Sequence, residues 1–375
     1  MGVSPALSDI ALSSTDTANL SLLPIGRLAV ETGDDINNYL NKVKAYEIDK
    51  NKIGDPNQTI NIQEPKKWAI HLGGGSDQSQ QNAYAGSLKF YESQFRGNSI
   101  GGTVYGLYKN NSSIQQDITS DRLKKLINRG VSQITFFGHS AATIFDVGID
   151  EPENFTNTGK YPFFLANGCN SGYIFSGSKG YSERFVLLPN KGAIGFLATA
   201  NFSYDNALIE YSRSFYSNLT NGNYGKTYGQ IALGSGNDII GSYPVNTLQS
   251  ELTTAQEFIL HGDPAIEAPY YGLPDYVIEP QQVSFIPSIV NASNSSFKLR
   301  LIVLNLGKAI NDTLQIEITR HVSNRNFVYK QTVKAPFYAD TIDIQIPTLE
   351  EEIGTGINNF DIKITVKGME NQMGI

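Results

Sequence analysis

The chain contains a single cysteine, and a histidine has an equivalent place earlier in the sequence. Cys169 follows the apolar run that begins at residue 161, and His139 follows the apolar run at residues 134–137. When neighbouring parallel strands deliver a thiol and an imidazole side by side, the imidazole can hold the sulfur as thiolate and then protonate a leaving amine. These residue types and their placement predict a cysteine hydrolase, and we interpret the chain as a cysteine peptidase.

Apolar runs alternate with amphipathic stretches between residues 23 and 264, which predicts an α/β domain with a parallel sheet. The expected helices cover residues 34–48, 80–95 and 248–260, with others starting at 120 and 203, and the expected strands lie at 68–72, 103–108, 134–137, 161–167 and 192–198. Open α/β sheets bind ligands at the carboxyl ends of their strands. The residues that follow four of these strands should therefore meet in one crevice, namely the glycines at 73–75 with Gly74 among them, His139, Cys169 and Thr199.

Composition and charge narrow the possible functions. The 375 residues are enough for two domains, and the net charge of −7 without any Lys/Arg cluster argues against nucleic acid as a partner. No apolar run approaches the roughly 18 residues that cross a bilayer, and no signal-peptide pattern begins the chain. The polar, Ser-rich residues 2–23 and the abrupt end suggest an excerpt from a longer precursor. A lone cysteine is compatible with an oxidising compartment.

A change of pattern near residue 264 marks a second domain. Prolines at 269, 274, 280 and 287 punctuate a linker, and helical periodicity disappears after it. The segments 297–305, 314–319 and 360–366 alternate apolar with polar residues, and about 100 residues of such strands predict an immunoglobulin-like β-sandwich without its disulfide. The predicted domains are residues 1–268, with 1–50 as the N-terminal part of the first, and residues 275–375.

Each candidate residue also has an ordinary structural explanation. A free cysteine is often a buried small hydrophobe, but Gly168 and the Asn-Ser-Gly sequence that follows Cys169 predict a turn from which the side chain emerges. Among the four histidines, only His139 follows a strand with a flanking glycine. One cysteine and few histidines do not assemble a zinc site, and the glycines at 73–75 lack the lysine of a phosphate-binding loop. Amides near Gly138 and Cys169 are placed to hold an oxyanion.

Five segments together resemble the gingipain family of cysteine peptidases, family C25 of the caspase-like clan. They are Phe-Phe-Gly-His-Ser at 136–140, Phe-Leu-Ala-Asn-Gly-Cys-Asn at 164–170, Glu-Arg-Phe at 183–185, Gly-Ala-Ile-Gly-Phe-Leu-Ala-Thr at 192–199 and His-Gly-Asp-Pro-Ala-Ile at 261–266. Caspases and legumains share the order of a histidine and then a cysteine, each after an apolar strand. The likeness covers about residues 20–268. Within the family it is greatest to the C-terminal-signal peptidases, or sortases, of type IX secretion.

The resemblance implies a three-layer α/β/α caspase-like fold with Cys169 as nucleophile and His139 as general acid and base. An acidic residue in the glycine loop of these enzymes assists the histidine or binds substrate, and Asp77 is the nearest match. Two positions depart from the family pattern. Ser140 stands where glycine is usual and could narrow the crevice, and Gly168 stands where alanine is common. The acid that selects Arg or Lys in gingipains is not placed by this sequence.

The resemblance also implies a location and partners. It implies a polypeptide substrate and an extracytoplasmic protein, at a bacterial cell surface, in the outer membrane or secreted, with outer-membrane or secretion-apparatus proteins as candidate partners. It implies no required cofactor and no catalytic metal, and it leaves a structural calcium ion open. A non-catalytic surface or secretion-apparatus scaffold with the same fold and a small-molecule amidase remain alternatives. A peptidase hydrolyses the thioester, whereas a sortase transfers the acyl group to an amine. Both reactions would use the same residues, so the sequence does not separate a peptidase from a sortase.

Overall fold

The chain divides into two compact units, residues 1–271 and residues 272–375. The computed structural model describes most of both units, and each is considered by itself below. The described residues are 8–14, 20–53, 55, 60–113, 116–117, 120–149, 151–175, 179–243, 250–291, 293–322, 325–348 and 358–366.

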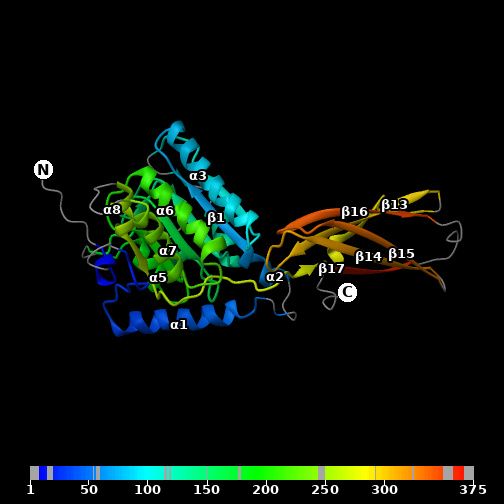
Figure 1. Ribbon diagram of the computed structural model, residues 1–375, viewed down its shortest axis with the longest axis horizontal. Coiled ribbons are helices and arrows are strands. Elements are labelled where there is room, and N and C mark those ends of the chain that lie inside the picture. Colours follow the sequence, from blue (N-terminus) through cyan, green and yellow to red (C-terminus); the bar gives the residue numbers. More distant parts are fainter. Residues whose placement is uncertain are drawn as a thin grey trace. The chain divides into compact units, whose positions relative to one another are not determined.

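A six-stranded sheet forms the centre of the first unit (Figure 1). Five strands run parallel, and the edge strand β10 pairs antiparallel with β9. This mostly parallel sheet confirms the α/β class that the sequence predicts. In spatial order the strands are β10 (Phe258–His261), β9 (Gly195–Thr199), β8 (Phe163–Asn167), β4 (Gln133–Phe137), β1 (Trp68–Gly73) and β2 (Thr103–Tyr108).

Helices cover both faces of this sheet, because the strands are apolar on both sides. On one face, α3, α6, α7 and α8 share a core with alternate strand residues such as Phe137, Phe163 and Leu197. On the other face, Phe164 and Phe196 contact Phe185 of α5, and α1 packs on α5. The helices are α1 (Gly33–Lys50), α3 (Gln78–Gly97), α4 (Ser120–Arg129), α5 (Tyr181–Leu187), α6 (Asp205–Ser217), α7 (Tyr228–Gly241) and α8 (Ser250–Glu257), with α2 (Ile60–Gln63) a single turn before β1.

One predicted helix is partly wrong. The helix expected over residues 248–260 ends at Glu257, and residues 258–261 form β10, with Phe258 opposite Thr199. The buried apolar run in β10 fits a strand as well as a helix by its pattern alone, and pairing with β9 decides the outcome. Residues 248 and 249, where that helix was expected to begin, lie outside the described residues.

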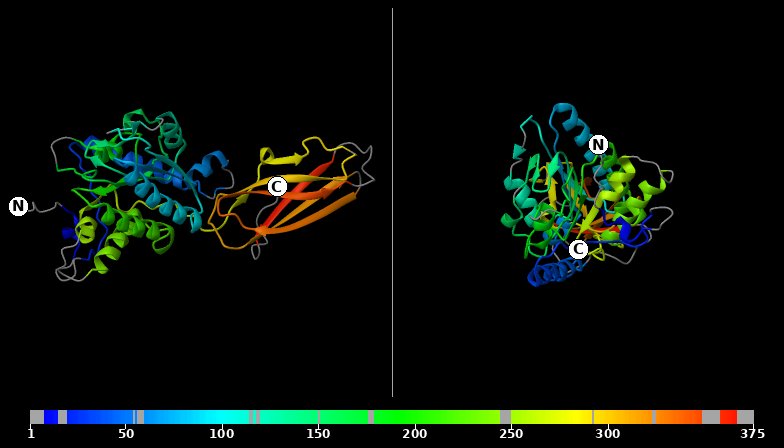
Figure 2. Two further views of the ribbon diagram at one scale, coloured as in Figure 1. Left: turned by 90° about the horizontal axis from the view of Figure 1, so that it is seen from above. Right: turned by 90° about the vertical axis from the view of Figure 1, so that its left-hand side faces the viewer.

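The second unit is built from antiparallel strands in two sheets that enclose one core (Figure 2). Residues from both sheets, such as Leu299 and Ile316, belong to the same buried cluster. This arrangement is compatible with a β-sandwich. One sheet holds β11 (Tyr276–Val277), β12 (Val283–Ile286), β13 (Ser296–Asn305) and β16 (Ala339–Pro347), and the other holds β14 (Thr313–Val322), β15 (Arg325–Lys334) and β17 (Asn359–Val366).

Packing around β8 should dominate the stability of the first unit. Phe163 is buried, and its ring stacks on Tyr228 with 3.8 Å between centroids. We expect Phe163→Ala to lower the free energy of unfolding by about 4 kcal/mol, because it leaves a cavity in the core. Trp68, the only tryptophan, lies in the same sheet and reports urea unfolding by fluorescence. The control Phe90→Ala alters a side chain that is 43% exposed and should cost under about 1 kcal/mol. Equal losses would contradict this packing.

Candidate active site

The two reactive side chains leave neighbouring strands at the same level. Strands β4 and β8 run parallel with Phe137 opposite Asn167, and His139 and Cys169 each lie two residues beyond that pair. The two turns stay joined past the strand ends, because the Gly138 N–H donates a hydrogen bond to the Asn167 carbonyl over 3.1 Å. Cys169 is half-buried and His139 is exposed. The thiol and the imidazole therefore both lie at the carboxyl edge of the sheet.

The sulfur of Cys169 lies against the backbone of the loop that follows β9. Its Sγ is 3.5 Å from both the nitrogen and the oxygen of Ser203. A thiol can donate to that oxygen and a thiolate can accept from that N–H, so the same residue serves both forms of the sulfur. The next residue, Asn170, adopts a left-handed φ of 55° and donates its N–H to the Asn201 carbonyl over 2.9 Å. The turn after Cys169 is thus held by this loop.

Side-chain hydroxyls hold the other side of the Cys169 turn. Thr199 Oγ1 donates to the Gly168 carbonyl and Ser140 Oγ donates to the Cys169 carbonyl, each over 2.9 Å. A Cβ at residue 168 would collide with Ser140 Oγ and approach the Gly138 carbonyl within 2.8 Å. The two departures from the gingipain pattern therefore compensate each other, because Ser140 occupies the space that an alanine at 168 would need.

The imidazole of His139 is anchored by α3. Its Nε2 lies 2.9 Å from Gln80 Oε1, and the Ser76 N–H donates to the same oxygen over 2.9 Å. An oxygen that accepts from Ser76 also accepts from the ring, so Nε2 carries the hydrogen and Nδ1 is the nitrogen that can take a proton from a thiol. Asp77 caps α3 by accepting the Gln80 N–H over 3.0 Å. Its predicted help to the histidine stays a prediction, and the contact with the ring belongs to Gln80.

Tyr84 of α3 lies between the reactive groups and the core. Its ring stacks on Phe137 at 4.4 Å and meets the edge of the His139 ring at 6.2 Å. Its hydroxyl donates to Asp205 Oδ2 over 2.9 Å. Burial, together with the nearby Asp205 carboxylate, raises the pKa of Tyr84, so the hydroxyl keeps its proton as a donor. The sequence placed this residue on a helix without giving it a role.

Asp146 is a buried carboxylate at the site that the sequence analysis missed. Its Oδ2 accepts the Gly75 N–H over 2.7 Å and lies 3.7 Å from Lys109 Nζ. Its backbone N–H donates to the His139 carbonyl over 2.9 Å. Asp146 therefore joins the glycine loop after β1 to the turn that carries the imidazole. The only signal in the sequence is a carboxylate inside the apolar segment Ile-Phe-Asp-Val at 144–147, because a charge there is buried only when it is paired.

Gly74 and Gly138 make room for that carboxylate. A Cβ on either glycine would overlap the Asp146 side chain. The Gly74 N–H donates to the Phe137 carbonyl, and the Gly138 N–H donates to the Asn167 carbonyl. The sequence analysis expected an amide near Gly138 to hold an oxyanion, but the N–H of Gly138 is already used in this hydrogen bond. Among the residues that the structure describes, the Cys169 N–H is a donor with no acceptor, and it remains free to meet an oxyanion.

The other histidines of the first unit are core residues. Burial lowers the pKa of His71 to about 3, and its Nε2 lies 2.8 Å from the Tyr216 hydroxyl. Burial likewise lowers the pKa of His261 in β10 to about 4. Within the described parts of the chain, no three His, Cys, Asp or Glu side chains group as metal ligands, and no helix is long and apolar enough to cross a membrane.

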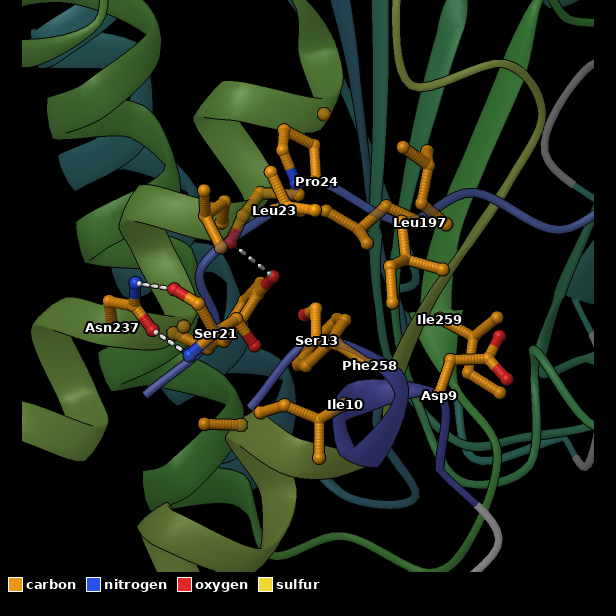
Figure 3. Close-up of a pocket in the computed structure, with 18 residues that line it drawn as sticks. Asp9, Ile10, Ser13, Ser21, Leu23, Pro24, Leu197, Asn237, Phe258 and Ile259 are labelled. Carbon is orange, nitrogen blue, oxygen red and sulfur yellow. Dashed lines mark hydrogen bonds between the residues drawn. The ribbon is translucent and has the colours of Figure 1, made fainter. Parts of the chain in front are cut away.

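A separate pocket lies between the N-terminal segment and the face of the sheet that α6, α7 and α8 cover (Figure 3). Ser21 closes one side of it by exchanging two hydrogen bonds with the side chain of Asn237, over 3.0 and 2.8 Å. Its lining also includes Asp9, Leu23 and Phe258. None of the predicted site residues lines this pocket, so it lies apart from Cys169 and His139.

The compensation between Ser140 and Gly168 can be tested by a double-mutant cycle. Gly168→Ala should lower the free energy of unfolding by about 2 kcal/mol through overpacking. In a Ser140→Gly background the loss should shrink by about 1 kcal/mol, because the nearer clash is removed while the Gly138 carbonyl remains. Urea unfolding followed by Trp68 fluorescence measures both values. Gly86→Ala, at an open helical position, is the control. Equal losses in the two backgrounds would refute the compensation.

Comparison with known proteins places this geometry in a family. Residues 4–269 match the model of peptidase family C25, while no curated protein sequence matches the chain. The structure resembles the Arg-specific cysteine proteinase gingipain R, with a TM-score of 0.59 and 14% identity over 97% of this chain and 77% of that one. It also resembles the complex of the pro- and mature domains of RgpB from Porphyromonas gingivalis, with a TM-score of 0.58 and 13% identity over 97% and 79%. These likenesses show a shared fold, and the family model covers most of the chain, so this protein belongs to peptidase family C25 and is a cysteine-type peptidase.

Proposed function

We propose that Cys169 and His139 form the catalytic dyad of an endopeptidase that works through a thioester acyl-enzyme. The observation that supports the dyad most directly is the shared position of the two residues beyond the β4–β8 pair. The hydrogen bond between Gln80 and Nε2 adds to it, because Nδ1 is then the basic nitrogen. Both turns also have backbone anchors, which favours a fixed geometry over a mobile one.

In this mechanism a proton moves from the Cys169 thiol to Nδ1 of His139. The thiolate attacks the carbonyl carbon of the scissile peptide bond, and the carbonyl oxygen becomes an oxyanion that accepts the Cys169 N–H. The intermediate then collapses to a thioester, and the imidazolium gives its proton to the leaving amine. Water or another amine attacks the thioester and releases the acyl group from the sulfur. Ser203 N–H, 3.5 Å from Sγ, stabilises the thiolate at the start and at the end of the cycle.

The proposed substrates are exported proteins outside the cytoplasm. The sequence likeness to C-terminal-signal peptidases of type IX secretion supports this class, and so does the lone cysteine. Secretion-apparatus or outer-membrane proteins are the proposed partners, and no cofactor is needed for the steps above. The second unit, with its two β-sheets, is proposed to be immunoglobulin-like.

Peptidase activity should depend on the thiol. In a mass-spectrometric assay on an unfolded protein substrate such as reduced casein, we expect cleavage with a bell-shaped pH profile. Cys169→Ala should reduce the rate at least about 1000-fold, because the nucleophile is lost. The control Ser93→Ala alters an exposed serine of α3 and should retain activity. Full turnover by the alanine variant would rule out Cys169 as nucleophile.

A thioester predicts a second product when a strong amine nucleophile is present. Hydroxylamine should convert part of the acyl product to a hydroxamate, 15 Da heavier than the acid, because it competes with water for the thioester. The same assay with a peptide amine in place of hydroxylamine measures transpeptidation and so separates a sortase from a hydrolase. An acid product alone at saturating hydroxylamine would contradict the acyl-enzyme.

A further inference from the structure

Glu257 is a buried acid at the same edge of the sheet as Cys169. It is the last residue of α8 and is 2% exposed. The Ala200 N–H donates to its carbonyl over 3.0 Å, one residue past the Phe258–Thr199 pair of β10 and β9. The backbone of Glu257 is therefore fixed next to the loop of residues 200–204, which begins directly after β9.

The Glu257 carboxyl group is poorly satisfied where it lies. Its Oε1 accepts a long hydrogen bond of 3.4 Å from Asn201 Nδ2, and its Oε2 is buried without a partner among the described residues. Burial raises the pKa of Glu257 from 4.5 to about 7, against a smaller opposing effect of the Asn201 hydrogen bond. A carboxylate in this position is shielded from bulk water and has no counter-ion among the described residues, so its charged form is disfavoured.

The charged groups that the structure describes on the surrounding elements are paired with other residues, so none of them compensates the charge of Glu257. From α6, α7, the N-terminal segment and α8 itself, the acidic or basic groups and their partners are Asp205 with Tyr84, Glu210 with Arg213, Asp238 with Ser214 and Asn218, Asp9 with Arg27, and Glu251 with Ser250. Tyr211 of α6 stacks on Phe258 and is buried with its pKa raised. The ionisation of Glu257 therefore acts mainly on the loop above it.

That loop makes the contacts that hold the nucleophile. Asn201 accepts the Asn170 N–H over 2.9 Å, and Ser203 contacts the Cys169 sulfur with both its nitrogen and its oxygen at 3.5 Å. The side chain of Asn201 is also the only one that donates to Glu257 among the described residues. One short loop thus connects the buried acid to the cysteine turn.

We propose that Glu257 is a positioning residue for Cys169: in its neutral form it lets the 200–204 loop close on the cysteine turn, and its ionisation loosens that loop. The effect of this loop on catalysis rests on the proposed role of Cys169 as nucleophile, whereas the coupling between Glu257 and the loop does not. Burial under the closed loop raises the pKa of Glu257 to about 7, whereas an open loop leaves it near its ordinary value of 4.5. Closure is therefore most stable below about pH 4.5, where Glu257 is neutral in both states. Closure weakens as the pH rises towards 7 and then changes little.

Hydrogen exchange followed by mass spectrometry tests this at pH 5, 6, 7 and 8, after correction for intrinsic exchange rates. We expect the protection of peptides that contain the Asn170 and Ala200 N–H groups to fall at least about tenfold between pH 5 and 8 in the unmodified chain. Glu257→Gln has nearly the same shape and cannot ionise, so its protection should stay constant over this range. Peptides from β1 and β2 should be unaffected in both proteins.

Two controls keep the test decisive. Glu251→Gln makes the same change on the same helix and should behave like the unmodified chain. Asn201→Ala keeps the acid but removes its donor, and should lower protection at every pH. A fall in Glu257→Gln equal to that of the unmodified chain, or no fall in the unmodified chain, would overturn the proposal. Exchange does not require turnover, so either result leaves the test of Cys169 as nucleophile unaffected.

Discussion

The parallel pairing of β4 with β8 is the constraint on which the site depends. With Phe137 opposite Asn167, the residues two positions further along each strand are the histidine and the cysteine. A slip of one residue in this register would turn one of the two side chains towards the other face of the sheet. The core around Phe163 and the aromatic stacking on both faces hold the register, so packing far from the thiol determines where the chemistry can occur.

Close packing against glycines positions the groups at this edge of the sheet, in addition to hydrogen bonds. Gly74 and Gly138 leave room for the Asp146 carboxylate, and Gly168 leaves room for the Ser140 hydroxyl. Two buried acids at this edge, Asp146 and Glu257, each keep one oxygen without a partner among the described residues. Burying a carboxyl oxygen without a hydrogen-bond partner lowers the stability of the fold at both acids. Such costs are typical where a fold fixes reactive groups. Here Asp146 is hydrogen-bonded to the turn that carries His139, and Glu257 is hydrogen-bonded to the 200–204 loop that contacts the Cys169 turn.

The sequence predicted what depends on pattern and missed what depends on contacts between distant segments. Apolar runs and strand ends located the α/β sheet and the shared edge of His139 and Cys169. The strand at 258–261 was predicted as helix because its identity is decided by pairing with β9. The roles of Gln80, Asp146 and Glu257 depend on which loops meet at the edge, and a single sequence does not contain that information. Asp77 shows the same limit, since its helix-capping role follows from local structure that the family likeness did not address.

The central claim is that His139 activates Cys169, and alkylation of the chain's only cysteine tests it most directly. Intact mass spectrometry would follow modification by a low dose of iodoacetamide at pH 6 and pH 8, with His321→Ala in the second unit as the matched control for His139→Ala. The account predicts fast modification at pH 6 in the unmodified chain and in the control. It predicts a rate at least about tenfold lower in His139→Ala, because that variant lacks the imidazolium that favours the thiolate at this pH. Equal rates in His139→Ala and the unmodified chain would contradict it.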